Sequence, residues 1–398
     1  LIRRTSVRLT PLLADASTGI HVRSSREYNR YEMALSVQKL ALTDFRSYPS
    51  GLFEFGERTV IIGPNAAGKT NVLESLYLLS SGKSFRADRE SEMVRWGETA
   101  ARVQAVFDRS GSRREVAALL SSGGRLTQKT FLVDSKKQPA RGLSQLFPMV
   151  LFSAEDVRLI DGSPGRRRRS LDLTITQGSP EYREALSRYN RALAGLDPAE
   201  EQDPAASEAG TAELDAWDEP LIAAGQAVVD GRRKYFDEIA GTLRKSYAAL
   251  TEASSGVATR LTVEYRPLAE QLGEVISSRR QQDIATGTTT AGPHRDDWTL
   301  VLGQRPIVSF GSGGEFRSAV LAWRLAESAH LAERTGLVPI TLLDDVFSEL
   351  DEFRRESLMP NLPDGQTVIT TPSSEPLPPA LQKGSTVIKI GPEQGARV

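Results

Sequence analysis

The stretch that decides the fold is Gly63-Pro64-Asn65-Ala66-Ala67-Gly68-Lys69-Thr70. A short apolar run, Val60-Ile61-Ile62, precedes it, and a mostly apolar segment over residues 71–79 follows it. Glycine, four residues and then Gly-Lys-Thr, set between a strand and a helix, is the spacing of a phosphate-binding loop. Glycines let the backbone N–H groups turn inward toward anionic oxygens, and the positive end of the following helix points at the same place.

The last two residues of the loop have distinct roles. Lys69 is expected to reach the β- and γ-phosphates of a nucleotide, and the hydroxyl of Thr70 is expected to ligate Mg²⁺. The alternative is a tight turn between strand and helix with no ligand. The flanking strand and helix are those that the motif requires, so they favour nucleotide binding.

Composition sets outer limits on the fold and on its chemistry. The 398 residues, 39% hydrophobic and 25% charged, are enough for two or three domains of an ordinary globular protein. No apolar run approaches the roughly eighteen residues that span a membrane. The chain has no cysteine, which excludes disulfides and thiolate zinc sites and suits a reducing cytoplasm. With a net charge of −1, any binding of nucleic acid must rely on a local basic surface.

A second motif supplies the carboxylates that a phosphate loop needs. Residues 337–343 form an apolar run that ends in Asp344 and Asp345. Asp344 is expected to complete the Mg²⁺ shell with Thr70, and Asp345 is placed to activate the attacking water. Together with Lys69, these two acids are the predicted catalytic residues. An apolar strand that ends in acids is a weak signal alone, and the phosphate loop makes it a strong one.

Two further pieces narrow the class. Ser312-Gly313-Gly314-Glu315 precedes a helical pattern from residue 316 to about 332, and this arrangement makes a second anion-binding helix start. Ser348-Glu349-Leu350-Asp351 follows the two acids directly. The order of phosphate loop, Ser-Gly helix start, paired acids and Ser-x-Leu-Asp is that of ABC-type ATPases. In that class two heads sandwich two ATP molecules, and the Ser-Gly motif of one head faces the phosphate loop of the other.

The remaining chain suggests an α/β head interrupted by a helical arm. Residues 1–32, rich in Arg and Ser, are interpreted as a poorly ordered extension or a transit peptide. Residues 33–178 are expected to form the first part of the head, with a mixed core sheet, an antiparallel β lobe and a strand pair turning at residues 47–51. Residues 179–285 carry apolar 3-and-4 spacing typical of a helical or coiled-coil arm, with an acidic flexible loop over 197–215. Residues 286–398 complete the head.

Two basic clusters are candidate DNA contacts. The run Gly165-Arg166-Arg167-Arg168-Arg169 is expected in a loop, and Arg232-Arg233-Lys234 lies on the second helix of the arm. Both clusters could instead be solvated faces, which is the common fate of charge runs. We take Arg166, Arg167, Arg232, Arg233 and Lys234 as the predicted DNA-binding residues.

At this point the chain resembles the RecF family, in the SMC-like branch of the ABC ATPases, from about Met33 to near the C-terminus. The resemblance rests on motifs in order along the chain. These are residues 42–48, the phosphate loop with Asn71 and Glu74, residues 82–86, 152–156, 168–172, 292–297, 312–317 and 342–351. Transporter-type ABC proteins place a His after the strand beyond the acids, whereas this chain has Thr370-Thr371.

The resemblance implies a specific function. RecF-like proteins bind ATP with Mg²⁺, form a homodimer on it and hydrolyse it slowly with stimulation by DNA. They bind single-stranded DNA gaps and their junctions with duplex. With RecR and RecO they help to load RecA, which supports recombinational repair, replication restart and the SOS response. The cofactor residues by this resemblance are Gly63 to Thr70, Ser312 to Glu315, and Asp351.

Three rival classes remain to be compared. A structural SMC-like protein needs a much longer coiled coil than this arm. A transporter's nucleotide-binding subunit lacks an arm of this size between the phosphate loop and the Ser-Gly motif. A small-molecule kinase would explain the phosphate loop but leaves Ser312 to Glu315 without a role.

Overall fold

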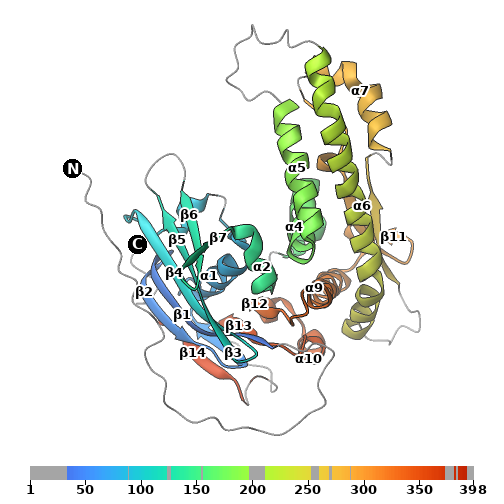
Figure 1. Cartoon of the computed structure of the whole chain (residues 1–398). Helices are drawn as coiled ribbons and strands as arrows, with labels where there is room; N and C mark the ends of the chain where they lie inside the picture. Colours follow the sequence, from blue (N-terminus) through green and yellow to red (C-terminus); the bar gives the residue numbers. More distant parts are fainter. Residues whose placement is uncertain are drawn as a thin grey trace, which may run out of the picture.

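An antiparallel sheet forms the first layer of the structure, a computed structural model (Figure 1). The structure describes residues 34–391, except 88, 123–126, 154–155, 197–210, 252–259, 269–270, 287, 373–380 and 382–383. The sheet order is β2-β1-β4-β5-β6-β7. Its strands are β1 (Leu35–Phe45), β2 (Tyr48–Glu54), β4 (Ala100–Arg109), β5 (Ser112–Ser121), β6 (Gln128–Val133) and β7 (Lys136–Gln138).

The first strand pair corrects a predicted turn. The chain reverses at Arg46 and Ser47, not over residues 47–51, because Arg46 adopts a left-handed conformation with φ 54°. Pro49 and Gly51 then lie inside β2, where proline is tolerated because β2 is an edge strand. A register shift in β1 next to Val37 explains why its buried positions jump from Val37 to Leu40.

A parallel sheet forms the second layer, in the order β14-β3-β13-β12-β8. Its strands are β3 (Arg58–Gly63), β8 (Met149–Ser153), β12 (Ile340–Asp344), β13 (Thr367–Pro372) and β14 (Thr386–Lys389). The buried Gln366 joins the two sheets, since its side chain bonds both the N–H and the C=O of Val37 in β1. The two sheets are therefore joined at the end of β13 that lies opposite the phosphate loop.

Helix α1 (Lys69–Ser81) packs against both sheets, with contacts to β4 and β5 on one side and to β8 and β13 on the other. Residues 71–80 are all buried, whereas the sequence indicated one apolar face. A helix enclosed by two layers needs apolar residues all round. Among the exceptions, Asn71 and Glu74 carry an amide and a carboxylate that need hydrogen-bond partners in this buried setting.

The arm is built from α5 (Pro180–Leu196), α6 (Thr211–Leu250) and α7 (Leu272–Thr286), and α4 (Pro164–Gly178) packs at its base against α5, α6 and α9. Helix α6 packs against α5, α7 and the head helix α9 (Gly313–Thr335). The arginine run 165–169 lies in helix α4, not in a loop, because Ser163 caps the helix and Pro164 starts it. Residues 211–215, predicted as part of the acidic loop, belong to α6, while 197–210 and the extension 1–32 lie outside the described residues.

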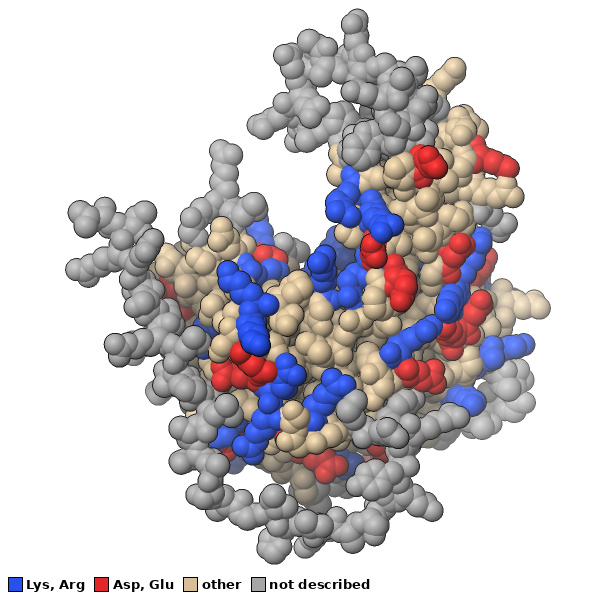
Figure 2. All heavy atoms as spheres, in the orientation of Figure 1, with Lys and Arg blue, Asp and Glu red and all other residues tan. Residues whose placement is uncertain are grey.

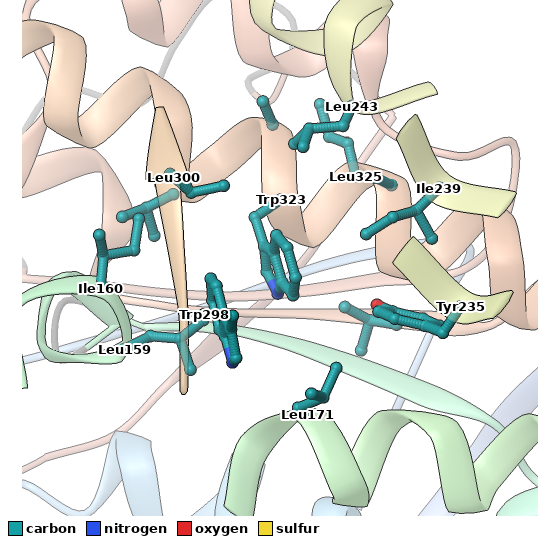
Figure 3. Close-up of a cluster of buried hydrophobic side chains, with 14 of the residues drawn as sticks. Leu159, Ile160, Leu171, Tyr235, Ile239, Leu243, Trp298, Leu300, Trp323 and Leu325 are labelled. Atoms are coloured by element: carbon teal, nitrogen blue, oxygen red, sulfur yellow. The ribbon is translucent and has the colours of Figure 1, made fainter. Parts of the chain in front are cut away.

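The base of the arm shares one core with the second half of the head (Figure 3). Trp298 and Trp323 stack with ring centroids 4.5 Å apart, and both side chains are buried. Tyr235 and Ile239 of α6 and Leu171 of α4 pack around them. The arm is thus anchored to the helix that carries the Ser-Gly motif.

The remaining elements are short. They are η1 (Glu90–Met93), η2 (Ala140–Gly142), α2 (Leu143–Leu146), α3 (Val157–Asp161), β9 (Leu261–Arg266), η6 (Pro293–Arg295), β10 (Asp297–Leu302), β11 (Arg305–Pro306), α8 (Ile307–Phe310), η7 (Val346–Glu349) and α10 (Glu352–Asn361). Strands β9, β10 and β11 form a third, antiparallel sheet. Among the described residues, no helix has both the length and the apolarity needed to cross a membrane. The mixed α/β head with an antiparallel lobe and a helical insertion confirms the predicted fold class.

Candidate nucleotide site

The phosphate loop has the backbone that its sequence predicts. It links the end of β3 to the start of α1, with Ala66 at φ 64° and Gly68 at φ 98°. A Cβ on Gly68 would come within 2.8 Å of the Tyr48 hydroxyl, and one on Gly63 within 2.5 Å of the Ile390 carbonyl. Pro64, Asn65 and Ala66 are exposed at the loop tip. No acidic residue lies in the first turn of α1, so the positive helix end remains available to an anion.

Lys69 is held against the loop. Its side chain is buried, and Nζ donates to the carbonyls of Gly63 at 2.8 Å and Pro64 at 2.9 Å. Burial lowers the pKa of Lys69, and the carboxylates of Asp345 and Asp344 oppose this shift. The predicted lysine and both predicted acids therefore lie close enough to interact.

Asp344 collects two hydroxyl groups at the end of β12. Its Oδ1 accepts from Thr70 at 2.9 Å and from Thr370 at 2.8 Å. Burial raises the pKa of Asp344, against the effect of these hydrogen bonds and of the nearby Arg86. The hydroxyl of Thr70 and the carboxylate of Asp344 form an all-oxygen donor set, which suits Mg²⁺.

Asp345 has an unusual backbone. Its φ of 53° and ψ of 29° place it in the left-handed region, and it caps the short helix η7. Its Oδ1 is buried without a hydrogen-bond partner in the part of the chain that the structure describes. Buried polar atoms are normally paired, so an unpartnered carboxylate oxygen beside Lys69 is suited to a functional role.

The Ser-Gly motif forms a second cluster. Ser312 caps α9 in a capping box, in which its hydroxyl accepts from the N–H of Glu315 at 3.3 Å and Glu315 accepts from the N–H of Ser312 at 2.8 Å. Asp351 caps α10 and accepts from the N–H of Arg354 at 2.9 Å. Gly314 lies against the Arg354 guanidinium, because a Cβ there would come within 2.6 Å of its Nη2.

The two clusters are separate. Ser312 and Gly313 are exposed at the start of α9. Between the described residues, no hydrogen bond or ion pair joins the cluster around Ser312 and Asp351 to the phosphate loop. Within one chain, the Ser-Gly motif and the phosphate loop therefore form two clusters that no such contact between described residues connects.

Comparisons with known proteins agree with this geometry. The family model described as RecF/RecN/SMC N terminal domain matches residues 36–385. The DNA replication and repair protein RecF of Heliobacterium modesticaldum is 35% identical over 339 residues, covering 82% of this chain and 89% of the relative. That of Myxococcus xanthus is 34% identical over 355 residues, covering 83% and 89%. The chain belongs to the RecF family.

A solved structure supports the same assignment. The structure described as the recombination mediator protein RecF with ATP in the RecFOR pathway is 27% identical to this chain, with a TM-score of 0.79. The similarity covers 90% of this chain and 98% of the other. The match thus extends through the arm as well as the head.

A polar network not assigned from the sequence supports the phosphate loop in this RecF-family chain. Arg46 donates to both carboxylate oxygens of the buried Glu74, at 2.8 and 2.6 Å. Ser84 and Arg86 bond the same carboxylate, at 2.5 and 3.1 Å, and Arg86 also bonds Asn71. The signal available in the sequence was an amide and a carboxylate, Asn71 and Glu74, within a mostly apolar helix.

The candidate DNA contacts divide into exposed and buried residues. Arg166 and Lys234 are exposed. Arg167 instead pairs with Asp297 through two hydrogen bonds of 2.8 and 2.7 Å. Arg233 is half-buried and lies 3.9 Å from Asp230.

The structure contradicts the prediction that Arg232 contacts DNA. Its side chain is 1% exposed and is paired with Asp172 at 2.9 Å and Asp296 at 3.0 Å. The predicted DNA contact is wrong for Arg232, because a guanidinium enclosed by α4, α6 and η6 cannot reach a phosphate. The loop at 292–297 is the other half of this structural ion-pair network.

Proposed function

We propose that this chain is an ATP-gated, DNA-binding homodimer of recombinational repair. The observation that carries the proposal is the separation of the site into two halves on one chain. The phosphate loop lies with Asp344 and Asp345, while Ser312 is exposed elsewhere on α9. A second copy, related by two-fold symmetry, would complete both sites at once.

Each residue has a role in this proposal. The loop N–H groups and Lys69 bind the β- and γ-phosphates, and Thr70 and Asp344 hold Mg²⁺, which neutralises phosphate charge. Asp345 orients the attacking water and accepts its proton. Ser312 and the N-terminus of α9 bind the γ-phosphate of the ATP that the partner copy holds. Hydrolysis is slow and DNA-stimulated, so that ATP acts as the switch for dimer and DNA binding.

Basic side chains support DNA as the ligand. Figure 2 shows Lys and Arg on both sides of the hollow between the antiparallel lobe and the arm. The segment over β7 and η2 carries exposed Lys136, Lys137 and Arg141 and no acid. On α5, exposed Arg191 lies on the face opposite α6. None of these four has a carboxylate at ion-pair distance within the described residues.

The charges on the two sides of the hollow lie close enough to act on each other. Arg183 of α5 has a pKa lowered first by burial and then by the like charge of Arg141 on η2. Arginines from both sides of the hollow whose like charges interact are expected to attract a polyanion. Contacts of this kind bind phosphates without reading sequence, as recognition of a gap or a junction requires.

The pathway follows from the family. The proposed substrate is gapped DNA at a junction of single strand and duplex, in a reducing cytoplasm. RecR and RecO are the proposed partners, and loading of RecA is the proposed outcome. That outcome would support DNA repair, replication restart and the SOS response.

The test is the molar mass in solution of Asp345→Asn, which slows turnover, measured by light scattering with and without ATP and Mg²⁺. We expect the mass to double only with ATP, and fluorescence anisotropy to show tighter binding of a gapped duplex under the same conditions. A chain that binds ATP and stays monomeric would overturn the proposal. Phosphoryl transfer to a small molecule by the monomer would favour the kinase alternative.

A further inference from the structure

Thr370 lies beside the two consecutive acids, Asp344 and Asp345. It lies on β13, between the strand of the phosphate loop and β12, in register with Asp344 on one side and Ile61 on the other. Its side chain is fully buried. Its hydroxyl donates to Oδ1 of Asp344 at 2.8 Å and accepts from the N–H of Asp345 at 3.0 Å. One hydroxyl therefore bonds both consecutive acids.

Asp345 needs such support because its backbone is strained. The left-handed region is unfavourable for residues with a Cβ, and such strain persists where the surroundings hold it. Two hydroxyls hold it here: Thr370 accepts the Asp345 N–H, and Ser348 donates to the Asp345 carbonyl at 2.7 Å. Consecutive side chains of an extended strand point to opposite faces. The left-handed turn ends that alternation directly after Asp344.

Packing alone does not account for this hydroxyl. Thr341 lies in the neighbouring strand β12, is equally buried, and has a hydroxyl without a partner among the described residues. The sheet thus tolerates a buried threonine that bonds nothing. The two bonds of Thr370 are specific to its place beside the acids.

We propose that Thr370 is a positioning residue for ATP hydrolysis: its hydroxyl fixes the Asp345 main chain and the Asp344 carboxylate in one arrangement. It does so without touching the nucleotide, since its side chain is fully buried and its one proton is donated to Asp344. This inference rests on the proposed function, because it assumes that Asp345 acts on the attacking water. Under this inference, Thr370 does not contribute to the affinity for ATP.

The experiment compares Thr370→Val, which removes the hydroxyl with little change of shape, with Thr370→Ser, which keeps it. Thr341→Val is the matched control, and Asp345→Asn is measured in parallel. For each variant we would measure single-turnover hydrolysis, the Kd for a fluorescent ATP analogue, and the lifetime of the ATP dimer after dilution. Supporting groups of this kind typically contribute 10- to 100-fold, so Thr370→Val should slow hydrolysis by about that factor.

The binding measurements separate positioning from folding. We expect the Kd of Thr370→Val for the ATP analogue to stay within about threefold of the parent, whereas loss of a binding interaction of 1.4 kcal/mol would change it about tenfold. We also expect Thr370→Val to prolong the lifetime of the ATP dimer, as Asp345→Asn does. Thr370→Ser should restore hydrolysis, and Thr341→Val should leave both rate and lifetime unchanged. If Thr370→Val loses ATP affinity along with hydrolysis, or hydrolyses at the parent rate, the inference is wrong. If Asp345→Asn itself fails to prolong the dimer, the proposed function fails first.

Discussion

The hydroxyl of Thr70 lies 2.9 Å from Oδ1 of Asp344, although the two residues are 274 positions apart in the chain. This contact joins the first residues of α1 to the end of β12, with strands β4 to β7 of the antiparallel sheet and the arm inserted between them. Strand β13 lies between β12 and β3, the strand that leads into the phosphate loop. Because the sheet is parallel, the carboxyl ends of β3 and β12 lie at the same edge of it. Parallel sheets bind ligands at the carboxyl ends of their strands, and this is where both residues lie.

Lys69→Arg should slow hydrolysis strongly and weaken ATP binding. The ammonium fits between two loop carbonyls at 2.8 and 2.9 Å in a buried site, and a planar guanidinium cannot occupy that space without moving the loop. Loss of one electrostatic contact to a transition state typically costs 10²- to 10³-fold in rate, so we expect a fall of about that size. Phosphate release under single-turnover conditions measures it. A rate within twofold of the parent would contradict the assigned role.

Ser312→Arg should leave ATP binding intact and prevent the ATP dimer. The side chain is exposed at the start of α9, away from the chain's own phosphate loop, so a large cation there should obstruct only a partner copy. Ser278→Arg, at an exposed site on α7, is the matched control. Light scattering with ATP gives the mass of each. Normal dimerisation of Ser312→Arg would show that the two-head sandwich is wrong.

The nucleotide half of the site was predictable because its signals are local in sequence. Glycine spacing, a cap such as Ser312 and an apolar strand ending in Asp344 each lie within a few residues. Thr370, Arg46 and Arg86 were not assigned roles, because their partners lie on other elements. Thr370, for example, bonds a carboxylate 26 residues away that only the parallel sheet brings near.

The predicted DNA contact of Arg232 was wrong for a related reason. Arg232, Arg233 and Lys234 are adjacent in sequence, but a helix turns consecutive residues to different sides. Arg232 faces Asp172, 60 positions away, whereas Lys234 faces solvent. Charge runs in sequence cannot separate a buried ion pair from an exposed cation.

Arg232→Met should destabilise the fold and not act on DNA binding directly. Removing one partner of a buried pair leaves the carboxylates of Asp172 and Asp296 uncompensated. That typically costs about 3–5 kcal/mol. Denaturant unfolding should show the loss, while Lys234→Met, exposed two positions on, should unfold like the parent. Equal stability of the two variants would contradict the assignment of Arg232 to the core network.

Charge reversal of the hollow should weaken DNA binding without affecting the ATP dimer. In Arg141→Glu/Arg191→Glu, two exposed cations on opposite sides of the hollow become acids. Each lost phosphate contact should lower the slope of log affinity against log salt by about one. The control is Lys245→Glu, because Lys245 is exposed near the C-terminal end of α6. Anisotropy with a gapped duplex at several salt concentrations measures the slope. An unchanged slope would place the DNA elsewhere.

His330 should make the protein less stable in acid. Burial lowers its pKa to about 4 from an ordinary 6.5, against the pull of Glu238, whose carboxylate lies 3.5 Å away. The unfolded chain therefore binds a proton between pH 6.5 and 4 that the folded chain does not, so stability falls as the pH falls through this window. The loss is on the order of 3 kcal/mol at the acid end.

The variant His330→Gln removes this proton and should flatten the fall in Tm between pH 6.5 and 4.5, measured by thermal unfolding. Glu238→Gln should act in the opposite direction, because losing the carboxylate lowers the pKa of His330 further and widens the window. Both variants also lose packing or pairing at neutral pH, so the comparison is the slope against pH and not the Tm at one pH. Parallel slopes for the parent and His330→Gln would show that other groups control acid stability.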